Sequence, residues 1–148
     1  YKRQVTMVIA VDFDGTIVEH KYPAIGRELP FATETLRMLI RDRHKLILWS
    51  VREGRLLDEA VEWCRERGVE FYAVNRDYPE ESREHDSFSR KLKADLFIDD
   101  RNIGGLPDWG TIYQMVRDRS TWEEVLEQRN SSFEKTEAPK RKKKWGIF

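Results

Sequence analysis

The stretch VTMVIAVDFDGT, residues 5–16, decides the fold of this chain. Its first part, residues 5–11, is a run of apolar and β-branched residues that is too short for a helix, and it predicts a β-strand buried on both faces. Asp12 and Asp14 follow directly, and Gly15 then permits a sharp turn of the backbone. The stretch therefore predicts a buried strand that places a pair of acids at its carboxyl end.

Strand and helix patterns alternate in the rest of the chain. The predicted strands are residues 45–51, 70–75 and 94–100, and the predicted helices lie around residues 32–40 and 57–64 and beyond residue 110. Residues 16–29 contain Pro23 and Gly26 and predict an extended hairpin, called the flap below. Strands that alternate with helices favour parallel pairing through right-handed crossovers, so we expect an α/β fold, a three-layer Rossmann-like sandwich with a mainly parallel sheet.

Acidic side chains gather where the predicted strands end. Asp99 and Asp100 close the last strand, as Asp12 and Asp14 close the first. Because the carboxyl ends of parallel strands form the ligand crevice of such sheets, we expect these four acids to converge. Carboxylates so close together repel one another, and Mg²⁺ would relieve that repulsion while leaving positions open for water and phosphate.

Hydroxyl and basic side chains follow on neighbouring segments. Ser50 lies at the end of the second predicted strand and can hydrogen-bond a phosphate oxygen, and Lys91 precedes the last strand and can neutralise charge on a transferred group. Arg52 can clamp a phosphate, although an exposed loop arginine is the commoner case. Each residue alone has an ordinary interpretation as a cap, turn or surface charge. Their joint order favours phosphoryl transfer, because no folding requirement explains it.

This joint pattern resembles the haloacid dehalogenase-like (HAD) hydrolase superfamily. Residues 12–16 (DFDGT) resemble its first motif and Ser50 its second, while Lys91 resembles the third and residues 98–100 (IDD) the fourth. All four occur in the order of the family, and the resemblance covers roughly residues 5–119. It implies a catalytic domain over residues 1–130, and the composition of residues 131–148 predicts a polar and then basic tail.

The resemblance implies a phosphatase, a hydrolase that forms an aspartyl-phosphate. Asp12 would attack phosphorus, and Asp14 would act as general acid and base. Mg²⁺ would be bound by Asp12, by the backbone carbonyl of Asp14, and by one or both of Asp99 and Asp100.

The remaining site residues would bind the phosphate. Lys91 is expected to be the catalytic lysine, with Lys93 as the competing choice, and Thr16, Ser50 and Arg52 are expected to contact phosphate or substrate.

The spacing of the motifs leaves no room for the cap domain that many HAD enzymes carry. We therefore expect a capless, open site that acts on a phosphorylated small molecule. Its specificity would come from the flap, from Arg52, from residues 101–110 or from another subunit, which leaves a homo-oligomer open.

The charge and cysteine content of the chain constrain its binding partners and its cellular location. The formal net charge is zero, which gives no overall attraction to nucleic acid, but residues 140–144 (KRKKK) form a basic run. The default expectation for such a tail is a disordered, solvated end. The less favoured alternatives are contact with nucleic acid or a membrane, and docking on its own or a neighbouring subunit. The single Cys64 is compatible with a reducing, cytoplasmic location, and no segment is long and apolar enough to span a membrane.

Two other functions use the same residues. A phospho-accepting or phosphate-binding regulatory module also unites acids, a hydroxyl and a lysine around Mg²⁺, but receiver domains place the acceptor aspartate after the third strand, where this chain has Val74 and Asn75. A phosphatase that acts on nucleic-acid ends would use the open site together with the basic tail, and its binding would depend steeply on salt.

Overall fold

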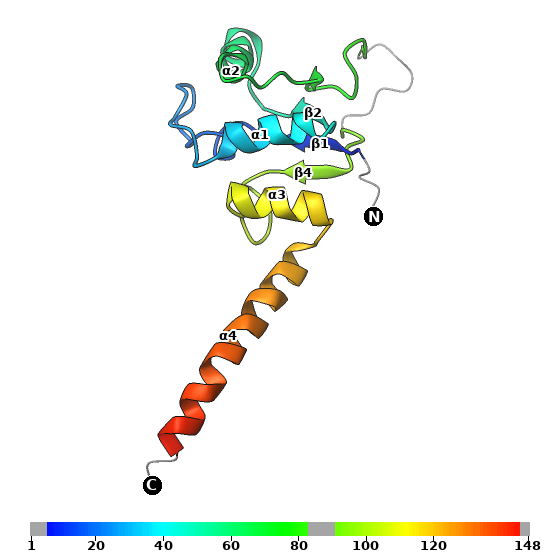
Figure 1. Ribbon diagram of the computed structural model, residues 1–148. Coiled ribbons are helices and arrows are strands. Elements are labelled where there is room, and N and C mark those ends of the chain that lie inside the picture. Colours follow the sequence, from blue (N-terminus) through cyan, green and yellow to red (C-terminus); the bar gives the residue numbers. More distant parts are fainter. Residues whose placement is uncertain (1–5, 83–90, 146–148) are drawn as a thin grey trace. The chain divides into compact units, whose positions relative to one another are not determined.

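The computed structural model describes the backbone of residues 6–82 and 91–145, and the side chains of residues 6–82 and 91–133. The chain forms two compact units, residues 1–110 and residues 111–148. In chain order the described elements are β1 (Val8–Val11), α1 (Ala32–Arg41), β2 (Lys45–Leu48), α2 (Gly54–Glu66), β3 (Ala73–Val74), β4 (Leu96–Ile98), α3 (Trp109–Asp118) and α4 (Trp122–Trp145) (Figure 1).

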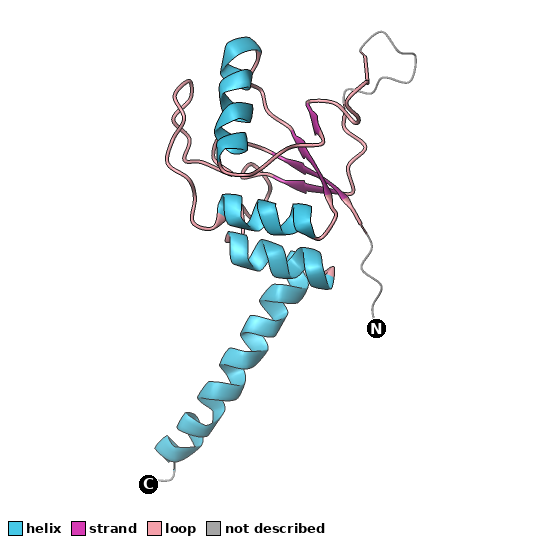
Figure 2. Ribbon diagram, turned by 45° about the horizontal axis from the view of Figure 1, so that its top comes forward, coloured by secondary structure: helices cyan, strands magenta, loops and turns pink. Residues whose placement is uncertain are grey.

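The sheet lies in the first unit and is parallel throughout. Its strand order is β3-β2-β1-β4, and the strands run side by side in Figure 2. At its carboxyl edge Val11 of β1 is paired with Leu48 of β2 and with Ile98 of β4. Helix α1 connects β1 to β2, and α2 connects β2 to β3. The predicted α/β class with a parallel sheet is confirmed.

Each strand is shorter than its sequence pattern predicts, and at β1 and β2 polar side chains take hydrogen bonds near the strand ends. Asp95 Oδ2 accepts the N–H of Val8 at 2.8 Å, where β1 begins. Asn75 Oδ1 accepts the N–H of Ser50 at 2.8 Å, beyond the end of β2. Val5, the predicted start of the first strand, lies outside the described residues. The sheet is therefore short, and its carboxyl edge passes directly into polar loops.

Both faces of the sheet are covered, as expected for parallel strands. One face carries the buried residues Ala10, Ile47 and Ala73, and Leu92 from the segment before β4 packs on them. Side chains alternate between faces along a strand, so Ile9, which is fully buried, points to the other face. Helix α1 packs along β2. The strand ends that carry the acids are thus held by a closed core.

The flap forms the hairpin that the sequence predicts. Glu19 N donates to Arg27 O at 2.8 Å, and Leu29 N donates to Ile17 O at 2.8 Å. Gly26 lies against the carbonyl of Glu19 with no space for a side chain. The flap therefore leaves the end of β1 and returns to α1 as one paired loop.

The second unit contains most of α3 and all of α4. Thr121 Oγ1 accepts the N–H of Glu124 at 3.2 Å, and Glu124 Oε2 accepts the N–H of Thr121 at 3.1 Å, so the two residues form a capping box at the start of α4. Helix α4 continues through residues 131–145, where the sequence favoured a disordered tail by default. The good helix formers Glu, Ala, Lys and Arg in this region favour a helix, which continues past Pro139. Within the described part of the chain, no helix has both the length and the apolar character that crossing a membrane requires.

Candidate functional site

The carboxyl edge of the sheet brings three of the predicted acids together. Asp12 follows β1, and Asp99 and Asp100 follow the neighbouring β4. One carboxylate oxygen from each of the three lies within 4.8 Å of the other two. This acid cluster, Asp12, Asp99 and Asp100, is the grouping expected from strand ends that meet at one edge.

Gly15 allows the acid cluster to be this compact. Its φ angle is +82°, in the left-handed region that glycine favours, and a methyl group at its Cα would overlap the carboxylate of Asp100. The turn after β1 and the end of β4 can approach each other only because this side chain is absent.

Thr16 joins the turn after β1 to the last acid of the cluster. Its Oγ1 accepts the N–H of Asp100 at 3.1 Å and lies 3.2 Å from Asp100 Oδ1 and 3.5 Å from Asp12 Oδ2. The indole of Trp109 donates to the carbonyl of Thr16 at 3.0 Å. Thr16 is fully buried. In this arrangement Thr16 orients the acids through its hydroxyl group. The sequence had instead predicted that Thr16 would contact the substrate.

The acid cluster perturbs the protonation of Asp12. Burial, followed by the negative charges of Asp99 and Asp100, raises the pKa of Asp12 from 3.8 to about 7, although its hydrogen bond with the backbone of Phe13 opposes the change. Three carboxylates with this mutual repulsion are stabilised by a proton or by a cation. Oxygen ligands of this kind suit Mg²⁺, so the donor set fits the metal that the sequence implied.

Asp14 points to Arg52. Arg52 Nε donates to Asp14 Oδ2 and Arg52 Nη2 to Asp14 Oδ1, both at 2.7 Å. Hydrogen bonding to Asp14 raises the pKa of the Arg52 guanidinium. Each oxygen of Asp14 keeps a second lone pair, which can accept a hydrogen bond from a further group.

Arg52 is placed differently from its predicted role as a phosphate clamp. The side chain is fully buried, and its remaining N–H groups point to the backbone carbonyls of Pro23, Ala24 and Leu56 at 3.2, 3.0 and 3.5 Å. Its guanidinium carbon lies 5.2 Å from the ring centroids of both Phe13 and Tyr22. With all five N–H groups directed at the protein, Arg52 has none left for a substrate in this conformation.

Ser50 stands at the edge of a cavity. Its N–H is held by Asn75, and its Oγ accepts the N–H of Arg52 at 3.1 Å. Among the described contacts the hydroxyl acts only as an acceptor, so its own proton can be donated to a ligand. The cavity beside it measures about 1140 Å³ and includes Val51, Asn75 and Arg76 in its wall.

The described contacts join neither candidate lysine to the acid cluster. Lys91 is exposed, with its Nζ 5.8 Å from the ring centroid of Phe97. Lys93 is also exposed, and its backbone N–H donates to Asp77 at 2.6 Å. The choice between the two lysines therefore stays open.

The sequence did not point to three contacts of the site. The Asp14–Arg52 pair and the Asn75–Ser50 bond join residues that are 38 and 25 positions apart, and the Trp109–Thr16 bond spans 93 positions. Trp109 had one available signal, its place within residues 101–110, which were expected to contribute to specificity. Asp108 directly precedes α3, with a carboxylate oxygen beside Gly110.

Comparisons with known proteins identify a relative of known structure. No known family matches the sequence, and no curated protein matches it. A solved structure of a conserved protein from Bacteroides thetaiotaomicron has 68% sequence identity to this chain. The match covers 82% of this chain and 98% of that protein, with a TM-score of 0.78.

Proposed function

This chain belongs to the same family as the conserved Bacteroides thetaiotaomicron protein, and we propose that it is a Mg²⁺-dependent phosphatase of the HAD type. In this proposal the parallel sheet is the centre of a three-layer, Rossmann-like domain without a cap, and the site is open to phosphorylated small molecules.

The observation that carries the proposal is the acid cluster after the D-x-D stretch. Asp12, Asp99 and Asp100 offer carboxylate oxygens within 4.8 Å of one another at the carboxyl edge of a parallel sheet. The backbone carbonyl of Asp14 would complete the protein ligands. When bound there, Mg²⁺ would offset the negative charge of the acids and of an incoming phosphate.

Asp12 and Asp14 divide the chemistry between them. A carboxylate oxygen of Asp12 attacks phosphorus while the bond from phosphorus to the leaving oxygen breaks, and Asp14 gives its proton to that oxygen. Water then attacks the phosphorus of the aspartyl-phosphate and passes a proton to Asp14. Inorganic phosphate leaves, and both side chains return to their starting states.

Other residues bind the phosphate or support the acids. Ser50 would donate its hydroxyl proton to a phosphate oxygen, since the described contacts leave that proton unused. Lys91 or Lys93 would neutralise charge on the transferred group after a movement of its side chain. Thr16 and Arg52 hold the acids rather than the substrate.

Phosphate release from an aryl phosphate tests this function. The purified protein should hydrolyse p-nitrophenyl phosphate with Mg²⁺, and both EDTA and Asp12→Asn should remove that activity. Asp58→Asn, an exposed acid on α2, is the matched control and should keep it. Hydrolysis that survives both EDTA and Asp12→Asn would contradict the mechanism.

A phospho-accepting regulatory module remains the alternative with the same residues. It would differ in the lifetime of phosphorylated Asp12, because a phosphatase hydrolyses its intermediate quickly, whereas a regulatory module keeps it. Phosphoprotein that persists for minutes without release of phosphate would favour the module.

A further inference from the structure

Arg52 connects two parts of the site that no other described side chain joins. Two of its N–H groups bind the carboxylate of Asp14, and two others bind the carbonyls of Pro23 and Ala24 at the tip of the flap. We propose that Arg52 is a positioning residue that couples the flap to Asp14, so that the flap must be closed for Asp14 to be correctly oriented. This inference rests on the proposed function.

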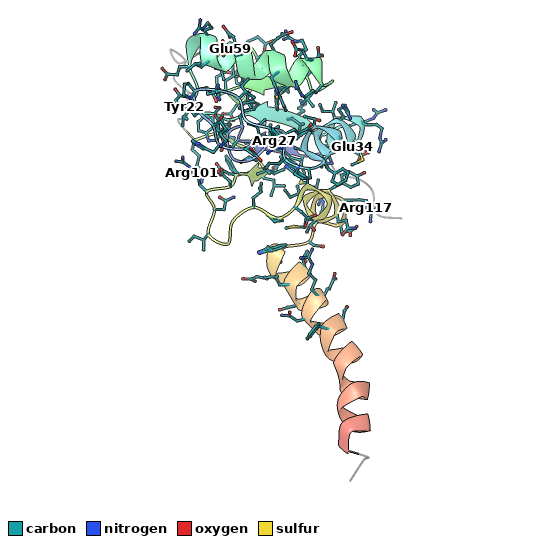
Figure 3. All side chains as sticks on the ribbon, turned by 90° about the vertical axis from the view of Figure 1, so that its left-hand side faces the viewer. Tyr22, Arg27, Glu34, Glu59, Arg101 and Arg117 are labelled. Carbon is teal, nitrogen blue, oxygen red and sulfur yellow. The ribbon has the colours of Figure 1, made fainter. Side chains whose placement is uncertain are left out.

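The surroundings of Arg52 support a fixed link rather than a mobile clamp. The side chain is fully buried, and its guanidinium carbon lies 5.2 Å from the ring centroid of Phe13, which is in the core, and 5.2 Å from that of Tyr22, which is on the flap and is labelled in Figure 3. A guanidinium is planar and rigid, so its donors to Asp14 and to the flap cannot move independently.

The flap depends on this link at its tip. The described backbone pairing of the flap lies at its base, in the bonds between Glu19 and Arg27 and between Leu29 and Ile17. Residues 22–24 lie beyond that pairing, and Arg52 binds two of their carbonyls. Opening of the tip would therefore break bonds of Arg52 and free Asp14 to rotate. Closure of the flap would restore the orientation of Asp14 for proton transfer.

Hydrogen exchange tests the coupling without any assay of activity. Arg52→Lys cannot reach both partners with one ammonium group, so exchange in residues 17–29 should rise at least severalfold. Asp14→Asn, although outside the flap, should also raise exchange there, because the amide offers Arg52 one acceptor oxygen where the carboxyl group offers two. Hydrogen exchange in β2 should stay unchanged in both variants. Arg27→Lys is the control, because the side chain of Arg27 is 90% exposed, and it should leave hydrogen exchange in the flap unchanged. If the flap of the Asp14→Asn variant exchanged at the same rate as that of the wild type, the proposed coupling would be overturned.

A double-mutant comparison tests the positioning role. If Arg52 acts through Asp14, Arg52→Lys should lower kcat by about 10²-fold with KM nearly unchanged, within the range for general acid–base catalysis. The double variant should be no slower than Asp14→Asn alone, because the two residues act as a unit. If the reductions in kcat of the two single variants multiplied in the double variant, or if Arg52→Lys changed only KM, Arg52 would instead be assigned to substrate binding and the proposal would be overturned. If the wild type released no phosphate, the proposed function would fail, and hydrogen exchange would still decide whether Arg52 joins the flap to Asp14.

Discussion

Asp12→Asn should stabilise the metal-free protein at pH 8 although it removes the proposed nucleophile. Burial and the charges of Asp99 and Asp100 raise the pKa of Asp12 to about 7 in the folded state. An acid whose pKa is raised on folding destabilises the folded state when it is ionised. This destabilisation is absent below pH 3.8, grows as the pH rises toward 7, and is complete above it.

The magnitude follows from the same values. A pKa raised from 3.8 to about 7 corresponds to about 4 kcal/mol, at about 1.4 kcal/mol for each pH unit. Asp12 is only partly buried, so solvent screening reduces this energy. We therefore expect Asp12→Asn to raise the free energy of unfolding by about 2 kcal/mol at pH 8 and by much less at pH 5.

Urea unfolding in EDTA measures the difference. The variant should show a higher midpoint than the wild type at pH 8 with an unchanged m-value, and the control Asp58→Asn should not. Added Mg²⁺ should stabilise the wild type far more than the variant, because a ligand that binds only the folded state raises its stability. A variant that is less stable than the wild type at pH 8, or a difference that does not depend on pH, would refute the reasoning.

Three further predictions concern the turn, the capping box and the lysines. Gly15→Ala should weaken Mg²⁺ binding by about 10- to 100-fold, measured by calorimetry, because the new methyl group displaces Asp100; unchanged affinity would contradict the close approach. Thr121→Ala should lower the free energy of unfolding by about 1 kcal/mol and weaken the helical signal in circular dichroism. An unchanged signal would show that the capping box does not stabilise α4. Replacing Lys91 and Lys93 separately by Met should lower kcat strongly for one of them only, and equal small losses would exclude both from catalysis.

The α/β class with its parallel sheet and the acid cluster could be predicted because they depend on local patterns. The apolar runs of β1 and β4 are bounded by acids in the sequence, and parallel strands bring their carboxyl ends to one edge. The grouping of Asp12, Asp99 and Asp100 follows from those two facts. The true lengths of the strands did not follow from the sequence, and neither did contacts such as the hydrogen bond between Val8 and Asp95, which are far apart in the chain.

The position of Arg52 could not be predicted, because it depends on how the flap folds back. Nothing in the sequence near Arg52 indicates that Asp14 and the carbonyls of Pro23 and Ala24 will surround it. An arginine after a strand is most often exposed, and only the closed flap makes a buried arginine favourable here. The helical tail also escaped prediction, because its composition is compatible both with disorder and with a helix that extends from the capping box.

Trapping of the aspartyl-phosphate tests the central claim most directly. The protein would be mixed with Mg²⁺ and an aryl phosphate, quenched in acid within one turnover, reduced with borohydride and digested for mass spectrometry. We expect residue 12 to be recovered as homoserine. Treatment with EDTA or the Asp14→Ala substitution should change only the amount of homoserine that is formed. Phosphate release with Asp12 recovered unmodified at every time point would contradict it.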